Sequence, residues 1–150
     1  MNDVFLGGTC ANNRWREEIV IPALLKSGVP ETTIFNPNLG PGMWNEEAQA
    51  VEDQVKQNCA LMVYYIGDTQ DGAGVSLYAA VEATMALYDD PERTIVIIDP
   101  TGTEGHVTKA LDKTLKDWRR RFPNAVIADN LQELIEYIVA RFRRDQDQNE

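Results

Sequence analysis

Residues 60–66, Ala-Leu-Met-Val-Tyr-Tyr-Ile, are the feature that most limits what this chain can fold into. The run is apolar throughout, so a strand formed by it must be buried on both faces. Residues 94–98, Thr-Ile-Val-Ile-Ile, show nearly the same pattern. Strands buried on both faces are typical of parallel sheets that helices cover on each side. The two runs therefore predict an α/β fold.

The rest of the chain alternates short β-type segments with amphipathic helical segments. The expected strands are residues 4–6, 32–35, 60–66, 94–98 and 125–128, and the expected helices are residues 14–27, 45–57, 76–89, 106–122 and 131–144. This alternation predicts a flavodoxin-like three-layer sandwich with a five-stranded parallel sheet in the order 2-1-3-4-5. Pro22 is expected to kink or divide the first helix. We expect one domain over residues 1–144 and a polar, frayed tail over residues 145–150.

Composition excludes several classes of function. The net charge of −10, from 24 acidic against 14 basic residues, argues against binding to duplex nucleic acid, which requires basic side chains to neutralise phosphates. One histidine and two cysteines without C-x-x-C spacing give no Cys/His metal site, and we expect no cofactor. No signal peptide or stretch of about 18 apolar residues is present, so we expect a cytoplasmic protein with reduced thiols and no membrane partner.

In a sheet of this order, ligands bind beyond the carboxyl ends of the strands where the order reverses. That point lies between the first and third strands and is surrounded by residues 7–13, 36–44 and 67–76. Neither a Walker A motif nor G-x-G-x-x-G occurs in the chain. Ser76 lies in Gly-Val-Ser-Leu-Tyr, which fails the nucleophile-elbow pattern, and Cys10 has no evident base to activate it as a nucleophile.

Glu82 is the candidate catalytic residue that the residue pattern itself selects. On a helix, its neighbours at three- and four-residue spacing are Tyr78, Ala79, Met85 and Ala86. An ionised carboxylate on such an apolar stripe costs several kcal/mol to desolvate unless it is paired. Two interpretations follow: a nucleophile at the mouth of the sheet, or a structural glutamate satisfied by a neighbouring side chain.

Other candidates also have two interpretations each. Asp68 and Asp71 are either solvated loop acids and helix caps or proton donors to a leaving group. Trp15 and Arg16 are either a packed tryptophan with a surface arginine, or Arg16 and the helix N-terminus face an anionic or sugar-bearing ligand. Trp44 is either a hydrophobic staple for its helix or a wall on which a base stacks.

Six short segments, spread in order over nearly the whole chain to about Phe142, carry a family resemblance. They are residues 5–10 (FLGGTC), 15–17 (WRE), 35–37 (FNP), 44–49 (WNEEAQ), 74–82 (GVSLYAAVE) and 91–94 (PERT). Together they resemble the nucleoside 2-deoxyribosyltransferase-like family, most closely its small phage and bacterial members. The resemblance implies a flavodoxin-like sandwich, in agreement with the strand pattern.

The resemblance also implies a chemistry for Glu82, which stands at the motif position of a nucleophilic glutamate. That glutamate attacks the anomeric carbon of a 2'-deoxynucleoside or its 5'-monophosphate and forms a covalent deoxyribosyl-enzyme, which a second base or water resolves. We expect the substrate site to be lined by Gly7, Gly8, Thr9, Trp15, Arg16, Asn36, Trp44 and Ser76. A homodimer or higher homo-oligomer is implied, because such sites are often completed across a subunit interface.

The chain departs from the family pattern near the nucleophile. Ser76 stands where an aspartate is usual, and Glu82 is followed by alanine instead of leucine and glycine. The acid that protonates the leaving base is therefore unassigned, with Asp68 and Asp71 as candidates. These departures favour one alternative, an inactive protein that binds and sequesters a nucleotide. A second alternative is an enzyme that cleaves the ribosyl bond of NAD by the same glutamate chemistry.

Overall fold

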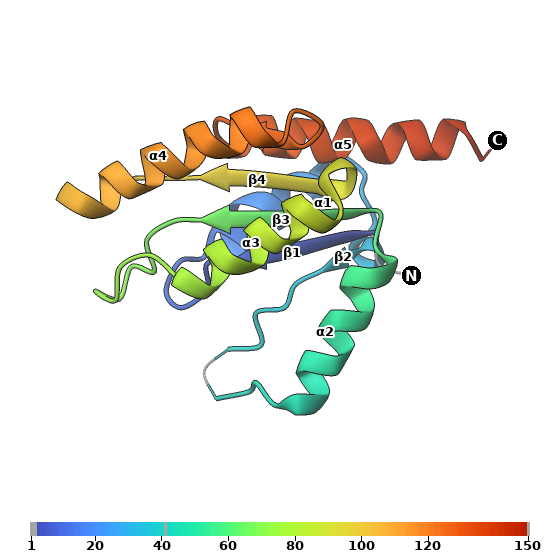
Figure 1. Ribbon diagram of the computed structural model, residues 1–150. Helices are drawn as coiled ribbons and strands as arrows, with labels where there is room; N and C mark the ends of the chain where they lie inside the picture. The colour runs from blue at the N-terminus through green and yellow to red at the C-terminus, as the bar shows by residue number, and fades with distance from the viewer. Residues whose placement is uncertain (1–2, 41, 150) are drawn as a thin grey trace.

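The computed structural model describes residues 3–40 and 42–149 and has one five-stranded parallel sheet between two layers of helices (Figure 1). The strand order β2-β1-β3-β4-β5 confirms the expected flavodoxin-like three-layer α/β sandwich. The strands are β1 (Val4–Gly8), β2 (Ile34–Phe35), β3 (Leu61–Ile66), β4 (Thr94–Ile98) and β5 (Val126–Ala128). The α-helices are α1 (Ile21–Lys26), α2 (Glu46–Asn58), α3 (Leu77–Asp89), α4 (Gly105–Arg121) and α5 (Leu131–Asp147).

The central strand β3 contributes to two separate cores because its side chains alternate between the faces of the sheet. Val63 and Tyr65 belong to the core beneath α1 and α5, whereas Met62 and Tyr64 belong to the core beneath α3 and α4. All positions of β3 are buried, as the apolar run predicts. The two-sided burial of this strand fixes the three-layer arrangement.

Three local details differ from the sequence-based expectations. The first helix is divided next to Pro22, as expected, but its first part is a π-helical segment, η1 (Trp15–Val20), and only the part from Ile21 is α-helical. β2 has two residues, because Glu31–Thr33 forms a 3-10 turn. Residues 145–147, expected in a frayed tail, continue α5, where Arg141 pairs with Asp145.

β1 extends through both glycines that were expected to end it, pairing Gly7 with Tyr64 and Gly8 with Tyr65. A Cβ on Gly8 would lie 2.1 Å from the Tyr65 carbonyl oxygen, and the φ of Gly8 is +104°. Only glycine fits this backbone without a local shift. A Cβ on Gly7 would likewise meet the Phe5 and Tyr64 rings at 2.5 and 2.9 Å, so glycine at both positions lets the carboxyl end of β1 pack closely against its neighbours.

Tyr65 links the carboxyl ends of β3 and β4. Its ring stacks on Trp15 with centroids 4.9 Å apart, and its hydroxyl donates a 2.7 Å hydrogen bond to Oδ2 of Asp99. Burial alone would raise the pKa of Asp99, but hydrogen bonds from Thr101 and Tyr65 lower it below its ordinary value. Burial and the bond to Asp99 both raise the pKa of Tyr65. The pair therefore favours an ionised Asp99 and a neutral phenol.

We predict that Tyr65→Phe lowers the free energy of unfolding by about 1 kcal/mol at pH 7, since Asp99 is partly exposed and loses one hydrogen bond. A carboxyl whose folded-state pKa is depressed stabilises the fold above its unfolded pKa and loses that effect as pH falls through its folded pKa. The difference between variant and wild type should therefore shrink below about pH 4. Urea unfolding at pH 7 and pH 3 measures it, with the exposed Tyr137→Phe as control; an equal difference at both pH values would contradict it.

Candidate functional site

A cavity of about 210 Å³ lies at the carboxyl ends of β1 and β2, between α2 and the start of α3. The cavity adjoins the point where the strand order reverses, between β1 and β3, because Gly7 and Gly8 of β1 and Ser76 at the start of α3 line it. Ligands bind at this point in folds of this kind. The described residues that line it are Gly7, Gly8, Cys10, Arg16, Pro37, Trp44, Gln49, Glu52, Ser76, Tyr78, Ala79 and Glu82. The cavity thus brings Glu82 together with Gly7, Gly8, Arg16, Trp44 and Ser76 from the expected substrate-binding set.

Glu82 lies at the edge of the packed face of α3. Ala79 and Ala86, one turn away on either side, are buried against the sheet, whereas Tyr78 and Met85 are exposed. The Glu82 side chain is 12% exposed, so its carboxylate is largely withdrawn from water. Only half of the apolar stripe expected around Glu82 is therefore buried in the core, and the other half is exposed. The Glu82 carboxylate lies at the boundary between them.

Lys56 is the partner of Glu82, and the sequence reasoning did not identify it. Its Nζ donates to Oε1 of Glu82 at 2.9 Å and forms an ion pair with Oε1 of Glu52 at 3.0 Å. The same ammonium lies 5.1 Å from the centroid of the Phe5 ring. The only signal in the sequence is the four-residue spacing of Glu52 and Lys56 on one helix, which is common on solvated surfaces.

The electrostatics of the cluster hold Lys56 in its charged form. Burial alone would lower the pKa of Lys56, but the hydrogen bonds and charges of Glu82 and Glu52 raise it well above its usual range. Burial raises the pKa of the nearby Tyr64 phenol, so this group stays neutral. The cluster therefore centres on one charged lysine that lies between two glutamate side chains.

Arg16 is a buried structural residue whose guanidinium also contributes to the cavity wall. Its Nε, Nη1 and Nη2 donate to the carbonyl oxygens of Leu6, Thr9 and Gly8 at 2.6, 2.7 and 3.0 Å. Burial lowers the pKa of Arg16, and the surrounding groups oppose that effect in part. The surface arginine considered from the sequence is wrong, because Arg16 is fully buried and three of its five N–H donors are bonded to backbone carbonyls.

Trp15 and Thr9, which were expected to line the substrate site, are not among the residues that line the cavity. Trp15 is buried and donates from Nε1 to the Thr9 carbonyl oxygen at 2.9 Å, in line with the packed-tryptophan interpretation. Thr9 is buried, and its hydroxyl donates to the carbonyl of Gly67 and accepts from the Gly67 amide. These two residues join the loops that follow β1 and β3, so their role here is to shape the site.

We predict that Arg16→Met destabilises the fold by about 3 kcal/mol or more, because it leaves three carbonyl oxygens without their donor. Arg16→Lys should recover only part of the loss, since an ammonium does not reproduce the planar set of donors. Urea unfolding at pH 7 measures both, with the exposed Arg14→Met two residues away as the matched control. A loss for Arg16→Met no larger than that of the control would contradict the prediction.

Asp68, Asp71 and Asn36 do not line the cavity. Asp71 is exposed, and its carboxylate accepts from the Thr69 hydroxyl and the Ala73 amide, bonds that lower its pKa. Asp68 forms an isolated antiparallel bridge with Val75 that closes the same loop. Both acids thus shape the loop before α3.

Asn36 anchors the loop that follows β2 to the first helical segment. Its amide and that of Asn38 donate to Oε1 of Glu17 at 3.1 and 2.9 Å. Burial alone would raise the pKa of Glu17, but these bonds lower it. The anchor fixes the start of the loop that carries Pro37 and Trp44 to the cavity.

The rim of the cavity combines aromatic and polar groups. Trp44 is 63% exposed and donates to Oε1 of Gln49 at 3.3 Å, and Tyr78 is 64% exposed. Ser76 caps α3 by accepting from the Ala79 amide, so the positive end of the helix dipole lies at the cavity. Cys10 is exposed on the lining, whereas Cys59 is buried. Flat rings and a helix N-terminus can together accommodate a base and an anionic or hydroxylated group.

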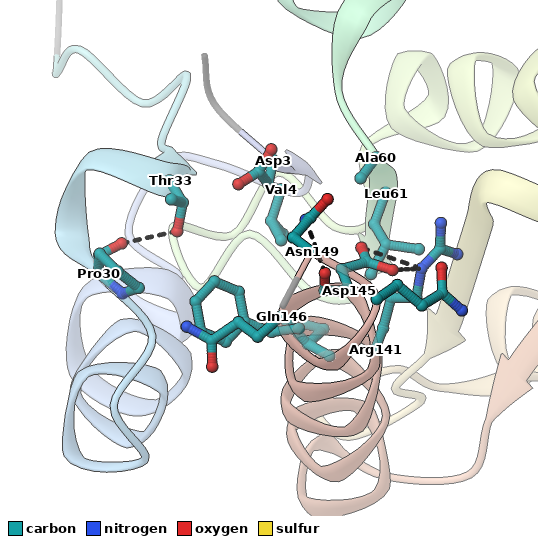
Figure 2. A pocket seen from close by; sticks show the side chains of 13 residues that line it. Asp3, Val4, Pro30, Thr33, Ala60, Leu61, Arg141, Asp145, Gln146 and Asn149 are labelled. Atoms are coloured by element: carbon teal, nitrogen blue, oxygen red, sulfur yellow. Dashed lines mark hydrogen bonds and ion pairs between the residues drawn. The ribbon is translucent and has the colours of Figure 1, made fainter.

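A second hollow, of about 450 Å³, lies at the opposite end of the sheet between α5 and the starts of β1 and β3 (Figure 2). Asp3 and Asn149 line it, and Arg141 pairs with Asp145 across one turn of α5. It is larger than the Glu82 cavity, but it lies at the amino ends of the strands. Ligands of parallel α/β folds bind at the carboxyl ends, so we assign the candidate site to the smaller cavity.

Comparison with known protein families, curated proteins and solved structures finds no match to this chain. Among residues 3–40 and 42–149, no three or more His, Cys, Asp or Glu side chains form a group that could hold a metal ion. Over the same residues, every helix is too short or too polar to cross a membrane.

Proposed function

We propose that this chain is an enzyme that transfers or hydrolyses the N-glycosidic bond of 2'-deoxynucleosides or their 5'-monophosphates. The observation that carries the proposal is a largely buried carboxylate, Glu82, held by Lys56 in a cavity at the reversal point of a parallel sheet. The six sequence segments that resemble nucleoside 2-deoxyribosyltransferase-like proteins supply the reaction class. Aromatic walls from Trp44 and Tyr78 suit a planar base.

The proposed chemistry proceeds through a covalent deoxyribosyl-enzyme. Departure of the base develops oxocarbenium character at the anomeric carbon, which a carboxylate stabilises and then captures. Lys56 is bonded to Oε1 of Glu82, which orients the carboxylate and leaves Oε2 as the attacking atom. Limited access of water to Glu82 favours capture by a second base over hydrolysis.

We predict that Glu82→Gln and Glu82→Ala lower base release from 2'-deoxyinosine or 2'-deoxycytidine by at least 1,000-fold, because both changes remove the carboxylate that forms the covalent intermediate. Chromatography of free base, with and without added adenine as acceptor, follows hydrolysis and exchange. Glu47→Gln, an exposed glutamate of α2, is the matched control. A folded Glu82→Ala variant with full activity would show that the nucleophile is wrong.

A nucleotide-binding protein without catalysis is the second candidate, and two observations favour it. Glu82 is already neutralised by Lys56, and neither Asp68 nor Asp71 lines the cavity. The exposed thiol of Cys10 allows a direct test, since Cys59 is buried and its burial raises its pKa. If deoxynucleotides protect Cys10 from iodoacetamide but release no base, the protein binds them without catalysis. If incubation with NAD releases nicotinamide, the protein is a NAD-cleaving enzyme.

We also propose a homodimer or higher homo-oligomer in the cytoplasm, with both thiols reduced. Leu77, Val81, Met85 and Tyr88 are exposed along α3, and a second copy of the chain could cover them. In a chain of net charge −10, a nearly uncharged helix face suits contact between like-charged copies. Light scattering of the purified protein determines the number of subunits.

A further inference from the structure

Two carboxylates line the cavity among the described residues, and they come from different helices. Glu52 extends from α2 and Glu82 from α3, with side chains 16% and 12% exposed. Both bind Lys56, at 3.0 and 2.9 Å, so the two bonded oxygens are at most about 5.9 Å apart. Retaining glycosidases place their two carboxyl groups roughly 5–5.5 Å apart, and inverting ones roughly 6.5–9.5 Å.

We propose that Glu52 is the acid and base of the reaction proposed above, on which this inference rests. The cavity offers Glu52 as a second carboxyl group facing the same space as the nucleophile. Asp68 and Asp71, the donors considered from the sequence, belong to the loop before α3 instead.

The two steps balance with Glu52 alone. In the first step an oxygen of Glu82 bonds to the anomeric carbon, the carbon–nitrogen bond breaks, and its electron pair leaves with the base. The base takes the proton of the Glu52 carboxyl. In the second step water or an acceptor base attacks the same carbon and gives a proton to the Glu52 carboxylate. The electron pair of the carbon–oxygen bond returns to Glu82.

The charges around Glu52 suit both roles. Lys56 and Glu82 face it directly, and Arg16, Tyr64 and Cys10 lie nearby. Glu52, Lys56 and Glu82 form one hydrogen-bonded cluster at the cavity, so a proton on Glu52 lies beside the space that the leaving base would occupy. Once Glu82 is esterified it loses its charge, and Lys56 then stabilises Glu52 alone as a carboxylate. Glu52 is then a base when the second step requires one.

The test compares Glu52→Gln with wild type on two substrates. 2'-Deoxyinosine needs a proton on its leaving base, whereas 7-methyl-2'-deoxyguanosine already carries a positive charge and leaves without one. We expect Glu52→Gln to slow base release from deoxyinosine by about 100-fold or more. The rate at which the variant forms the covalent intermediate from the methylated substrate should change little. Intact-mass spectrometry should show a deoxyribosyl group accumulating on Glu52→Gln. Azide, which attacks without a base, should restore turnover.

Glu47→Gln is again the matched control, and circular dichroism confirms that each variant folds. If Glu52→Gln does not fold, Glu52→Asp keeps the carboxyl group and should release base from deoxyinosine more slowly than wild type, with its pH profile shifted. If Glu52→Gln is fully active and Glu82→Gln is inactive, the role of Glu52 is wrong and the proposed function stands. Equal losses on both substrates without an adduct would also overturn the role of Glu52. A wild type that releases neither base would overturn the proposed function, and this inference with it.

Discussion

The burial of β3 on both faces is the constraint on which the rest of the structure depends. Its side chains fill two cores, and its backbone sets the register of β1 on one side and β4 on the other. The pairing of Gly8 with Tyr65 places a strand with no side chains at its end beside an aromatic residue. The close approach of β1 to β3 follows from that pairing, and Gly7 and Gly8 both contribute to the lining of the candidate cavity.

The candidate site is assembled by buried polar contacts that join separate loops. Arg16 binds three carbonyl oxygens around the end of β1, and Thr9 binds both the amide and the carbonyl of Gly67 after β3. Buried polar groups need such partners, because an unpaired one costs about 1–3 kcal/mol. These contacts fix the floor of the cavity, so a ligand would meet a largely preformed surface.

Lys56 gives the site its electrostatic character. It joins α2 to α3 through two carboxylates and keeps both near the same space. A largely buried ion pair of this kind contributes little net stability once desolvation is counted. The same contacts satisfy Glu82 as a structural residue would be satisfied, and both proposals rest on the position of the cluster at the cavity.

The sequence by itself determined the fold class, the strand order and the position of Glu82 on its helix. Apolar runs such as residues 60–66 specify burial through local pattern alone, and Asn45, Ser76 and Asn130 cap their helices as polar residues at helix starts do. Only the tertiary structure decided which groups meet. It paired Glu82 with Lys56, 26 positions earlier in the chain, buried Arg16 and kept Asp71 in its loop. Such contacts depend on how helices pack across the sheet, and no local spacing in the sequence encodes that.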